Sequence, residues 1–279
     1  MQVYLNGAYL DAAEARISPD DRGFLFADGL YEALLAYRGR ILLGPPHAAR
    51  MRAGLAALQI DTSPADQLLD VGERLVRLNQ LTDRPALVYA QVTRGSAPRR
   101  HAFPPAGTPP TVYLFAKPFV RQPDELFRNG CAAITVPDTR GSRCDIKTIG
   151  LLANVLANEA AHAAGALEAL FVRDGVIIEG SHSNVMAVIR GELVTYPSCN
   201  YILTGVTRNC VLDLARTMSF PVREGPIFAA QVDEAEELFV TGTTLEIMPI
   251  ATLDGRPIGE CRPGPLATRL LQEYRRLSD

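Results

Sequence analysis

Residues 169–189 read ALFVRDGVIIEGSHSNVMAVI, and this stretch decides the expected fold. Three apolar runs, at 169–173, 176–179 and 185–189, have the length and β-branched content typical of buried strands. The turn Arg173-Asp174-Gly175 joins the first two runs and predicts an antiparallel hairpin. Because hairpins take the place of a regular strand–helix–strand alternation, the pattern favours an α+β fold over a Rossmann-like parallel sheet.

The rest of the chain has the same mixture of hairpins and amphipathic helices. An Asn6-Gly7 turn joins two short apolar runs near the beginning, which is the signature of another hairpin. Apolar positions three and four residues apart predict helices, and short β-branched runs predict strands. The other expected strands are 3–5, 8–10, 31–37, 41–43, 86–93, 111–116, 132–136 and 237–241, and the expected helices are 47–58, 66–79, 149–164, 207–218 and 266–277.

Length and proline positions predict two domains. The chain has 279 residues, about twice the ~150 residues of a common domain. Pro118 and Pro123 bound a short connection, because proline interrupts both strands and helices. We therefore expect a smaller N-terminal domain at 1–117, a linker at 118–123 and a larger C-terminal domain at 124–279.

Composition excludes several classes of function. The chain has 28 Lys and Arg against 31 Asp and Glu, a net charge of −3 that gives no footprint for nucleic acid or an anionic membrane. The five cysteines are an odd number without a CxxC pair, so we expect reduced thiols and no metal site. No apolar run approaches the ~20 residues of a membrane span. The N-terminus lacks a basic start and an apolar stretch, so we expect a cytoplasmic protein.

Two charged residues lie in sequence contexts that could support chemistry. Lys147 has apolar neighbours within 146–152, and such surroundings can free an amine to react near neutral pH. A solvated lysine is the commoner explanation of such a residue. Glu179 ends an apolar run, so its carboxylate is expected to be buried and to need a cationic partner. The alternative is a strand-end turn in which Ser and Asn bond to the local backbone.

Two hydroxyl-rich turns predict an anion site. Gly205, Val206 and Thr207 begin an expected helix, whose first N–H groups and positive dipole end attract anions. An ordinary N-cap by Thr207 explains the same residues equally well. Residues 241–244, Thr-Gly-Thr-Thr, follow another strand and could face the same anion, and Arg50 could add a fixed charge. A lysine, a buried carboxylate, two such turns and an arginine are together the groups needed to hold pyridoxal phosphate.

In this combination, the chain resembles the fold type IV pyridoxal-phosphate enzymes. Residues 21–32, DRGFLFADGLYE, look like the N-terminal signature of that family. The other family motifs are matched in chain order by Lys147, Glu179-Gly180, Ser183-Asn184, 205–208 and 241–244. The resemblance implies an α+β, two-domain fold of the D-amino acid aminotransferase type, with the cofactor in the interdomain cleft. The family includes D-amino acid and branched-chain aminotransferases, (R)-amine transaminases and aminodeoxychorismate lyases.

The resemblance also implies a role for each motif. Lys147 would form the internal aldimine with pyridoxal 5′-phosphate and then move a proton between the substrate and the cofactor. Glu179 would pair with the pyridine N1–H, so that the ring acts as an electron sink. Gly242 stands where relatives often have a hydroxyl residue, so only its N–H can contribute. The implied cofactor contacts, besides these three residues, are Arg50, Ser183, Asn184, Leu203, Gly205, Val206, Thr207 and Thr243.

Residues 92–104, VTRGSAPRRHAFP, bear on the subfamily. Arg99 and His101 can both donate to one carboxylate, although a solvated basic loop is the simpler interpretation. The string resembles the carboxylate trap of D-amino acid aminotransferases, in which a tyrosine joins the arginine and the histidine. Tyr31 stands at the matching position, and Thr244 would also contact the substrate. In that family the loop crosses a dimer interface, so a homodimer is implied.

The favoured function is therefore ping-pong transamination of D-alanine with 2-oxoglutarate to give pyruvate and D-glutamate. The alternatives are transamination of L-branched-chain amino acids or (R)-amines and, behind these, an aminodeoxychorismate lyase, which needs no such trap. A catalytically idle cofactor-binding or scaffold protein is disfavoured because Lys147 and Glu179 are retained. His182 departs from the serine usual in D-specific relatives, and Arg100 adds a charge that could favour dicarboxylate substrates.

Overall fold

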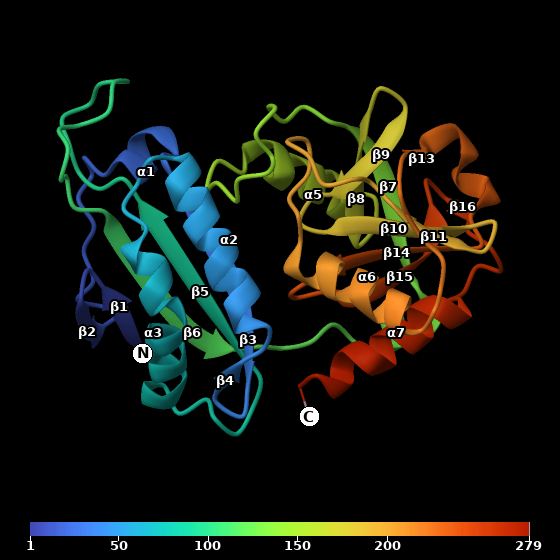
Figure 1. Cartoon of the computed structure of the whole chain (residues 1–279), viewed down its shortest axis with the longest axis horizontal. Helices are drawn as coiled ribbons and strands as arrows, with labels where there is room; N and C mark the ends of the chain where they lie inside the picture. Colours follow the sequence, from blue (N-terminus) through green and yellow to red (C-terminus); the bar gives the residue numbers. More distant parts are fainter. Residues whose placement is uncertain (279) are drawn as a thin grey trace. The chain divides into compact units, whose positions relative to one another are not determined.

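The computed structural model describes residues 1–278, which form two compact units (Figure 1). The first unit consists of Met1–Val120 and Ile146–Gly150, and the second of Arg121–Asp145 and Leu151–Asp279. The chain therefore passes between the units three times. The short segment at 146–150 packs with the first unit. The domain bounds expected from the sequence remain a prediction.

The first unit is an antiparallel six-stranded sheet in the order β2-β1-β6-β5-β3-β4. Helices α2 and α3 lie along one face (Figure 1), where alternate strand residues such as Leu34 and Val88 pack against Leu55 and Leu75. The strands are β1 (Gln2–Leu5), β2 (Ala8–Asp11), β3 (Gly29–Tyr37), β4 (Arg40–Ile41), β5 (Ala86–Thr93) and β6 (Thr111–Pro118). The helices are α1 (Arg22–Phe26), α2 (Gly44–Ala57) and α3 (Ser63–Leu78).

The second unit is built on a ten-stranded mixed sheet, in which β16 pairs beside the path β12-β11-β10-β14-β15-β7-β8-β9-β13. Helix α5 packs on β7 and β8, α6 and α7 pack on β14, and α7 packs also on β15. The strands are β7 (Cys131–Pro137), β8 (Glu168–Arg173), β9 (Val176–Gly180), β10 (Asn184–Ile189), β11 (Glu192–Thr195), β12 (Val222–Glu224), β13 (Ile227–Phe228), β14 (Glu237–Gly242), β15 (Glu246–Leu253) and β16 (Arg256–Pro257). The helices are α4 (Asp124–Asn129), α5 (Leu152–Ala163), α6 (Val206–Thr217), the 3-10 helix η1 (Ala229–Glu234) and α7 (Pro265–Arg276).

The hairpin that decided the expected fold is present, since β8 and β9 pair antiparallel around residues 173–176. Helices and hairpins are mixed as expected for α+β, although β7, α5 and β8 form one parallel crossover. The predicted strand at 41–43 stops at Ile41, because Leu43 adopts a left-handed conformation (φ 51°) and caps α2. Helix α2 then begins three residues earlier than predicted, because its two prolines occupy the first turn, where proline is tolerated.

Strand β15 is the longest element that the sequence analysis did not predict. Its sequence, EIMPIATL, contains Pro249, which argues against a central strand because proline cannot donate to a ladder. In the structure Pro249 pairs with Phe239 of β14 on one side only, and pairing with β7 on the other side starts at Ile250. The proline therefore costs no hydrogen bond to β7.

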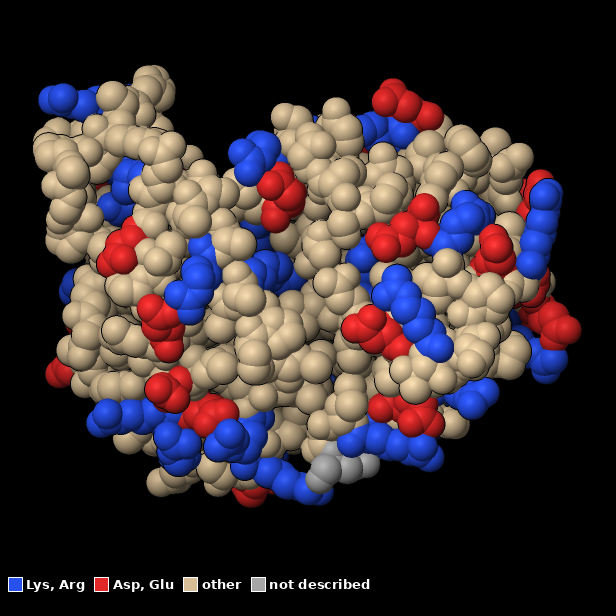
Figure 2. All heavy atoms as spheres, viewed as in Figure 1, with Lys and Arg blue, Asp and Glu red and all other residues tan. Residues whose placement is uncertain are grey.

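The surface carries intermixed charge. Over the face in Figure 2, Lys and Arg side chains lie among Asp and Glu side chains. Within residues 1–278, no helix combines the length and the apolar character that crossing a membrane requires.

Candidate active site

Lys147 lies on a short extended segment that pairs with the beginning of β3. The Tyr31 N–H donates to the Lys147 carbonyl at 3.0 Å, and the Ile149 N–H donates to the Gly29 carbonyl at 3.2 Å. Because the chain pairs with β3 here, helix α5 begins only at Leu152, and the predicted helix at 149–164 is wrong in its first turn. The lysine is thus held by strand-like hydrogen bonds rather than at a helix end.

The amine of Lys147 has an aromatic neighbour. Its Nζ lies 4.2 Å from the centroid of the Tyr31 ring, which stacks on Tyr89 of β5 at 5.7 Å. Within residues 1–278, no carboxylate pairs with this amine. Lys117 and Lys147 are the two lysines of the chain. An amine that is not neutralised by a carboxylate suits a nucleophile, and Lys147 meets this condition.

A buried carboxylate orients Arg50, the arginine predicted to bind phosphate. Arg50 donates from Nε and Nη2 to the two oxygens of Glu32 at 2.7 and 2.8 Å, and His47 Nδ1 lies 2.8 Å from Oε2. Burial raises the pKa of Glu32, but Arg50 and His47 outweigh this effect and lower the pKa to about 2. The sequence analysis did not select Glu32 or His47. The signal available was a lone acidic residue on the apolar face of β3.

Arg99 and His101 are both exposed on the irregular loop at 94–110, which we call the trap loop. The two side chains flank the ring of Phe26, with the Arg99 guanidinium carbon 5.0 Å and the His101 ring centroid 5.5 Å from its centroid. Within the described part of one chain, no hydrogen bond or ring contact joins either side chain to Tyr31. The structure thus brings two of the three predicted trap residues together.

In the second unit, Glu179 is the penultimate residue of β9 and is buried at 4% exposure. Its carboxylate accepts hydrogen bonds from Arg140 Nη1, from the Leu203 N–H at 3.0 Å and from Asn184 Nδ2 at 3.3 Å. The cationic partner that a buried carboxylate requires is therefore Arg140. This arginine is not predicted from the sequence, because it lies in a loop 39 positions before Glu179 and no periodic pattern marks it.

Asn184 also shapes the N-terminus of α6. Its Nδ2 donates to the Leu203 carbonyl at 2.8 Å, and a Cβ on Gly205 would lie only 2.1 Å from its Oδ1. Gly205 is the N-cap of α6 and makes no side-chain cap, so the first helical N–H groups lack a capping side chain. Thr207 lies in the first turn of the helix. Its alternative interpretation as the N-cap is therefore wrong.

The second hydroxyl-rich turn, at residues 241–244, lies at the end of the sheet where β10 begins. Asn184 begins β10 and pairs with Thr241 of β14, which ends at Gly242. A Cβ on Gly242 would lie 3.5 Å from the His182 carbonyl and 3.9 Å from the Ser183 Cβ, which are ordinary contacts. The sheet thus brings residues 182–184 beside Gly242 and the start of the turn that continues through 243–244. A hydroxyl side chain in place of Gly242 would fit.

A second buried carboxylate, Glu168, holds the loop at 181–183. It accepts hydrogen bonds from the Ser181 N–H at 3.0 Å, the Ser181 hydroxyl at 2.5 Å and the Ser183 hydroxyl at 2.6 Å, and His182 Nδ1 lies 3.2 Å away. Burial raises the pKa of Glu168, but His182 and the two serines outweigh it and lower the pKa to about 2. The proton of the Ser183 hydroxyl is therefore committed to Glu168 rather than to a cofactor.

The groups described so far fit pyridoxal phosphate by their chemistry. The first turn of α6 without a capping side chain is a site for a phosphate. The buried Glu179 carboxylate suits a protonated pyridine nitrogen, and the Lys147 amine suits an aldehyde.

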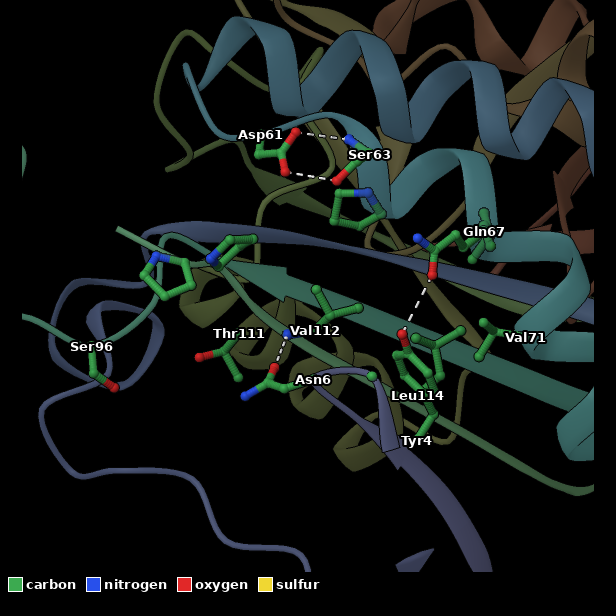
Figure 3. Close-up of a pocket in the computed structure, with 15 residues that line it drawn as sticks. Tyr4, Asn6, Asp61, Ser63, Gln67, Val71, Ser96, Thr111, Val112 and Leu114 are labelled. Carbon is green, nitrogen blue, oxygen red and sulfur yellow. Dashed lines mark hydrogen bonds between the residues drawn. The ribbon is translucent and has the colours of Figure 1, made fainter. Parts of the chain in front are cut away.

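A pocket of about 530 Å³ lies in the first unit, between the start of α3 and the sheet (Figure 3). Tyr4 and Gln67 approach each other across it, with the Tyr4 hydroxyl 3.5 Å from Gln67 Oε1. Ser96 and Pro110, near the two ends of the trap loop, also line it. The pocket is lined by none of the predicted site residues, so it does not belong to the candidate site.

Comparison with known proteins places these residues in a family context. The family model described as amino-transferase class IV matches residues 29–253. A D-alanine aminotransferase of Staphylococcus haemolyticus is 38% identical over 98% of this chain and 95% of its own length. A D-alanine aminotransferase of Bacillus licheniformis is 38% identical over 95% of this chain and 93% of its own length.

Among solved structures, a branched-chain amino acid aminotransferase of Escherichia coli superposes with a TM-score of 0.90 at 25% identity, covering 98% of this chain and 93% of that one. A branched-chain amino acid aminotransferase solved with pyridoxamine 5′-phosphate superposes with a TM-score of 0.86 at 26% identity over 98% of this chain and 92% of that one. The fold is therefore the fold type IV fold that the sequence motifs predicted.

Proposed function

Because the chain belongs to the class IV aminotransferases, we propose that it transfers the amino group of D-amino acids to 2-oxo acids. D-Alanine and 2-oxoglutarate would give pyruvate and D-glutamate in a ping-pong reaction. The observation that carries this proposal is the pair Arg99 and His101, presented together on the trap loop of a chain that matches D-alanine aminotransferases along nearly its whole length. The cofactor, pyridoxal 5′-phosphate, supplies an electron sink for the substrate carbanion and carries the amino group between the two half-reactions.

Lys147 is the proposed nucleophile and the group that moves a proton at the substrate Cα. Its extended segment is fixed to β3 by backbone hydrogen bonds, and the Tyr31 ring limits where the amine can lie. A positioned amine of this kind transfers protons efficiently because little reorganisation is needed.

Glu179 is the proposed partner of the pyridine nitrogen. Hydrogen bonds from Arg140, Asn184 and the Leu203 N–H favour its charged form, so it can hold a proton on that nitrogen. Ser183 and Asn184 lie at the adjoining end of β10, and the Leu203 side chain would cover one face of the ring.

The phosphate is proposed to bind at α6. Gly205, Val206 and Thr207 provide the uncapped helix start, with Gly242 and Thr243 on the turn beside residues 182–184. Arg50, which Glu32 orients, would add the balancing charge.

The substrate carboxylate is proposed to bind to Tyr31, Arg99 and His101, with Thr244 also in contact. Because no hydrogen bond or ring contact joins Tyr31 to Arg99 or His101 within the described part of one chain, we propose that two copies complete each other's sites in a homodimer. Exposed apolar side chains on α5, Leu152 at 74% and Leu156 at 62%, support burial against a second copy. A cytoplasmic location agrees with this reaction.

The reaction is tested by a half-reaction titration of the loaded protein. Cofactor absorbance is followed as D-alanine, D-glutamate, L-leucine or (R)-1-phenylethylamine is added. Conversion by the D-amino acids supports the proposal. Conversion by L-leucine alone would instead favour a branched-chain enzyme, the activity named for the similar solved structures.

Lys147 is tested by attachment rather than by turnover. Borohydride reduction of the loaded protein, followed by peptide mass analysis, should fix the cofactor on Lys147. With two lysines in the chain, Lys117→Ala is the matched control and should label fully, whereas Lys147→Ala should not label. A label found on Lys117 would contradict the assignment.

A further inference from the structure

Asp28 joins two arginines beneath the trap loop. Its carboxylate accepts hydrogen bonds from Arg22 Nε at 2.7 Å and from Arg94 Nε and Nη2 at 2.8 and 3.0 Å. The side chains of all three residues are at most 12% exposed. We call this group the arginine clasp. It holds two positive charges against one negative charge, so the remaining guanidinium protons need other acceptors.

Those acceptors are backbone carbonyls. Arg22 donates from Nη1 to the carbonyl of Arg100 at 2.7 Å, with the carbonyls of His101 and Ala102 at 3.4 Å from its Nη groups. Three consecutive carbonyls of the trap loop thus converge on one buried guanidinium. Arg94 donates in the same way to the carbonyls that follow α2, at Leu58 and Gln59.

Two aromatic rings, one on α1 and one on the trap loop, reinforce the same contact. The Arg22 guanidinium carbon lies 4.8 Å from the Phe26 centroid, and this ring is the one that Arg99 and His101 flank. The Arg94 guanidinium carbon lies 3.7 Å from the centroid of Phe103. Backbone hydrogen bonds from Arg22 to Gly95 at 2.9 Å and from Arg94 to Asp28 at 3.1 Å tie the loop base to residues at the start of α1 and just after its end.

We infer that Arg22 is a positioning residue for substrate recognition: its guanidinium fixes the backbone at 100–102, so that Arg99 and His101 present their side chains together. The inference rests on the proposed carboxylate role of Arg99 and His101. The planar fork of arginine is required, because a lysine ammonium cannot bond Asp28 and several carbonyls in this geometry. Ser96, which is labelled in Figure 3 and lies close to the loop base, is held separately by a β-bridge to residue 21.

The anchoring itself is tested by limited proteolysis of the full chain. Trypsin cuts after arginine, and Arg99 and Arg100 are exposed, so the rate of cleavage there reports on loop mobility. Arg22→Gln should cleave at Arg99 or Arg100 about tenfold faster or more than the parent, because the hydrogen bonds it loses are charge-assisted. Arg22→Lys should lie between the two. Arg84→Gln, which removes an exposed arginine of the same unit paired with Asp83, is the matched control and should cleave at the parent rate.

The effect on recognition is tested by a double-mutant cycle with Arg99→Ala. Arg22→Gln should raise the KM for D-alanine and for 2-oxoglutarate about tenfold while kcat changes less than about threefold. In the Arg99→Ala background, Arg22→Gln should cost less than it does alone, because only His101 is left to position. Arg22→Lys keeps the charge and serves if Arg22→Gln does not fold.

The outcomes distinguish the positioning role of Arg22 from the proposed carboxylate trap. Parent-like cleavage and KM in both Arg22 variants would overturn the inference, and so would losses that fall on kcat or add in full to those of Arg99→Ala. If Arg99→Ala leaves KM unchanged while Arg22→Gln still speeds cleavage, the carboxylate trap fails and the anchoring of the loop stands.

Discussion

Glu32 and Glu179 are both strand carboxylates buried in the protein and paired with an arginine, yet they do opposite things. The partners of Glu32 are two side chains of one helix, at positions 47 and 50, so the carboxylate serves to orient a cation. The partners of Glu179 come from three separate segments, at 140, 184 and 203, so the carboxylate itself is the oriented group. The number of separate segments that bond to a buried carboxylate therefore distinguishes the two cases. A carboxylate bonded by several segments is itself oriented, whereas a carboxylate bonded by one helix orients its cationic partner.

The largest effect on catalysis that this contrast predicts is that of Glu179→Gln. If Glu179 pairs with the pyridine nitrogen as proposed, the loss of its charge should lower kcat about 100-fold or more, since removing one oriented electrostatic partner typically costs this much. Steady-state kinetics with D-alanine measures the loss. Glu192→Gln, an exposed glutamate of the same unit paired with Arg223, is the control and should keep parent activity.

Glu32→Gln should instead act mainly on stability. The change leaves Arg50 and His47 beside a neutral amide, and breaking a buried pair in this way costs about 3–5 kcal/mol of unfolding free energy. Urea denaturation measures the loss, with Glu73→Gln on α3 as the control. If Glu32→Gln abolished catalysis without lowering stability, the distinction between the two carboxylates would be lost.

The dependence of unfolding stability on acid pH tests the role of Glu32 further. The pKa of Glu32 is about 2 in the folded protein against 4.5 ordinarily, so its ionised form stabilises the fold above pH 4.5. That contribution is lost as the pH falls from about 4.5 toward 2. Urea midpoints measured across this range should fall less steeply for Glu32→Gln than for the parent. Parallel curves would show that Glu32 does not carry the linkage.

The smallest expected effect is that of Asn184→Ala. The side chain makes one hydrogen bond to the Leu203 carbonyl at 2.8 Å and a longer one to Glu179, so about 1 kcal/mol of local stabilisation is at stake. Cofactor affinity, followed by absorbance during dialysis, should weaken about fivefold. An unchanged affinity would mean that the other hydrogen bonds suffice to orient Glu179.

How far the sequence predicts this site depends on the distance between partners along the chain. Strand β5 at 86–93 was predicted with its observed bounds, and the burial of Glu179 followed from the apolar run before it. Both features depend on local periodicity. Arg140 and Glu168 were missed because each meets its partner through sheet pairing or loop return, which leaves no periodic mark.

Family motifs supplied part of what periodicity could not. They singled out Lys147 although its local context is that of an ordinary solvated lysine, and they singled out the turn at 241–244. They did not reveal that Lys147 is paired with β3, because the apolar residues after it also suit a helix. Hydrogen bonds to β3 favour the strand-like pairing of residues 147–149 over a helix.

The excursion of residues 146–150 has a consequence for any attempt to divide the protein. The amine of Lys147 belongs to the first unit by packing and to the second by chain connection, because the chain enters this segment from Asp145 and leaves it to Leu151. A gene fragment ending at Val120 would encode the six-stranded sheet without Lys147, the proposed nucleophile. A fragment starting at Arg121 would carry the lysine without the strand that fixes it. Neither fragment is expected to keep the proposed chemistry. Gene fusion or recombination could transfer that chemistry only if both units moved together.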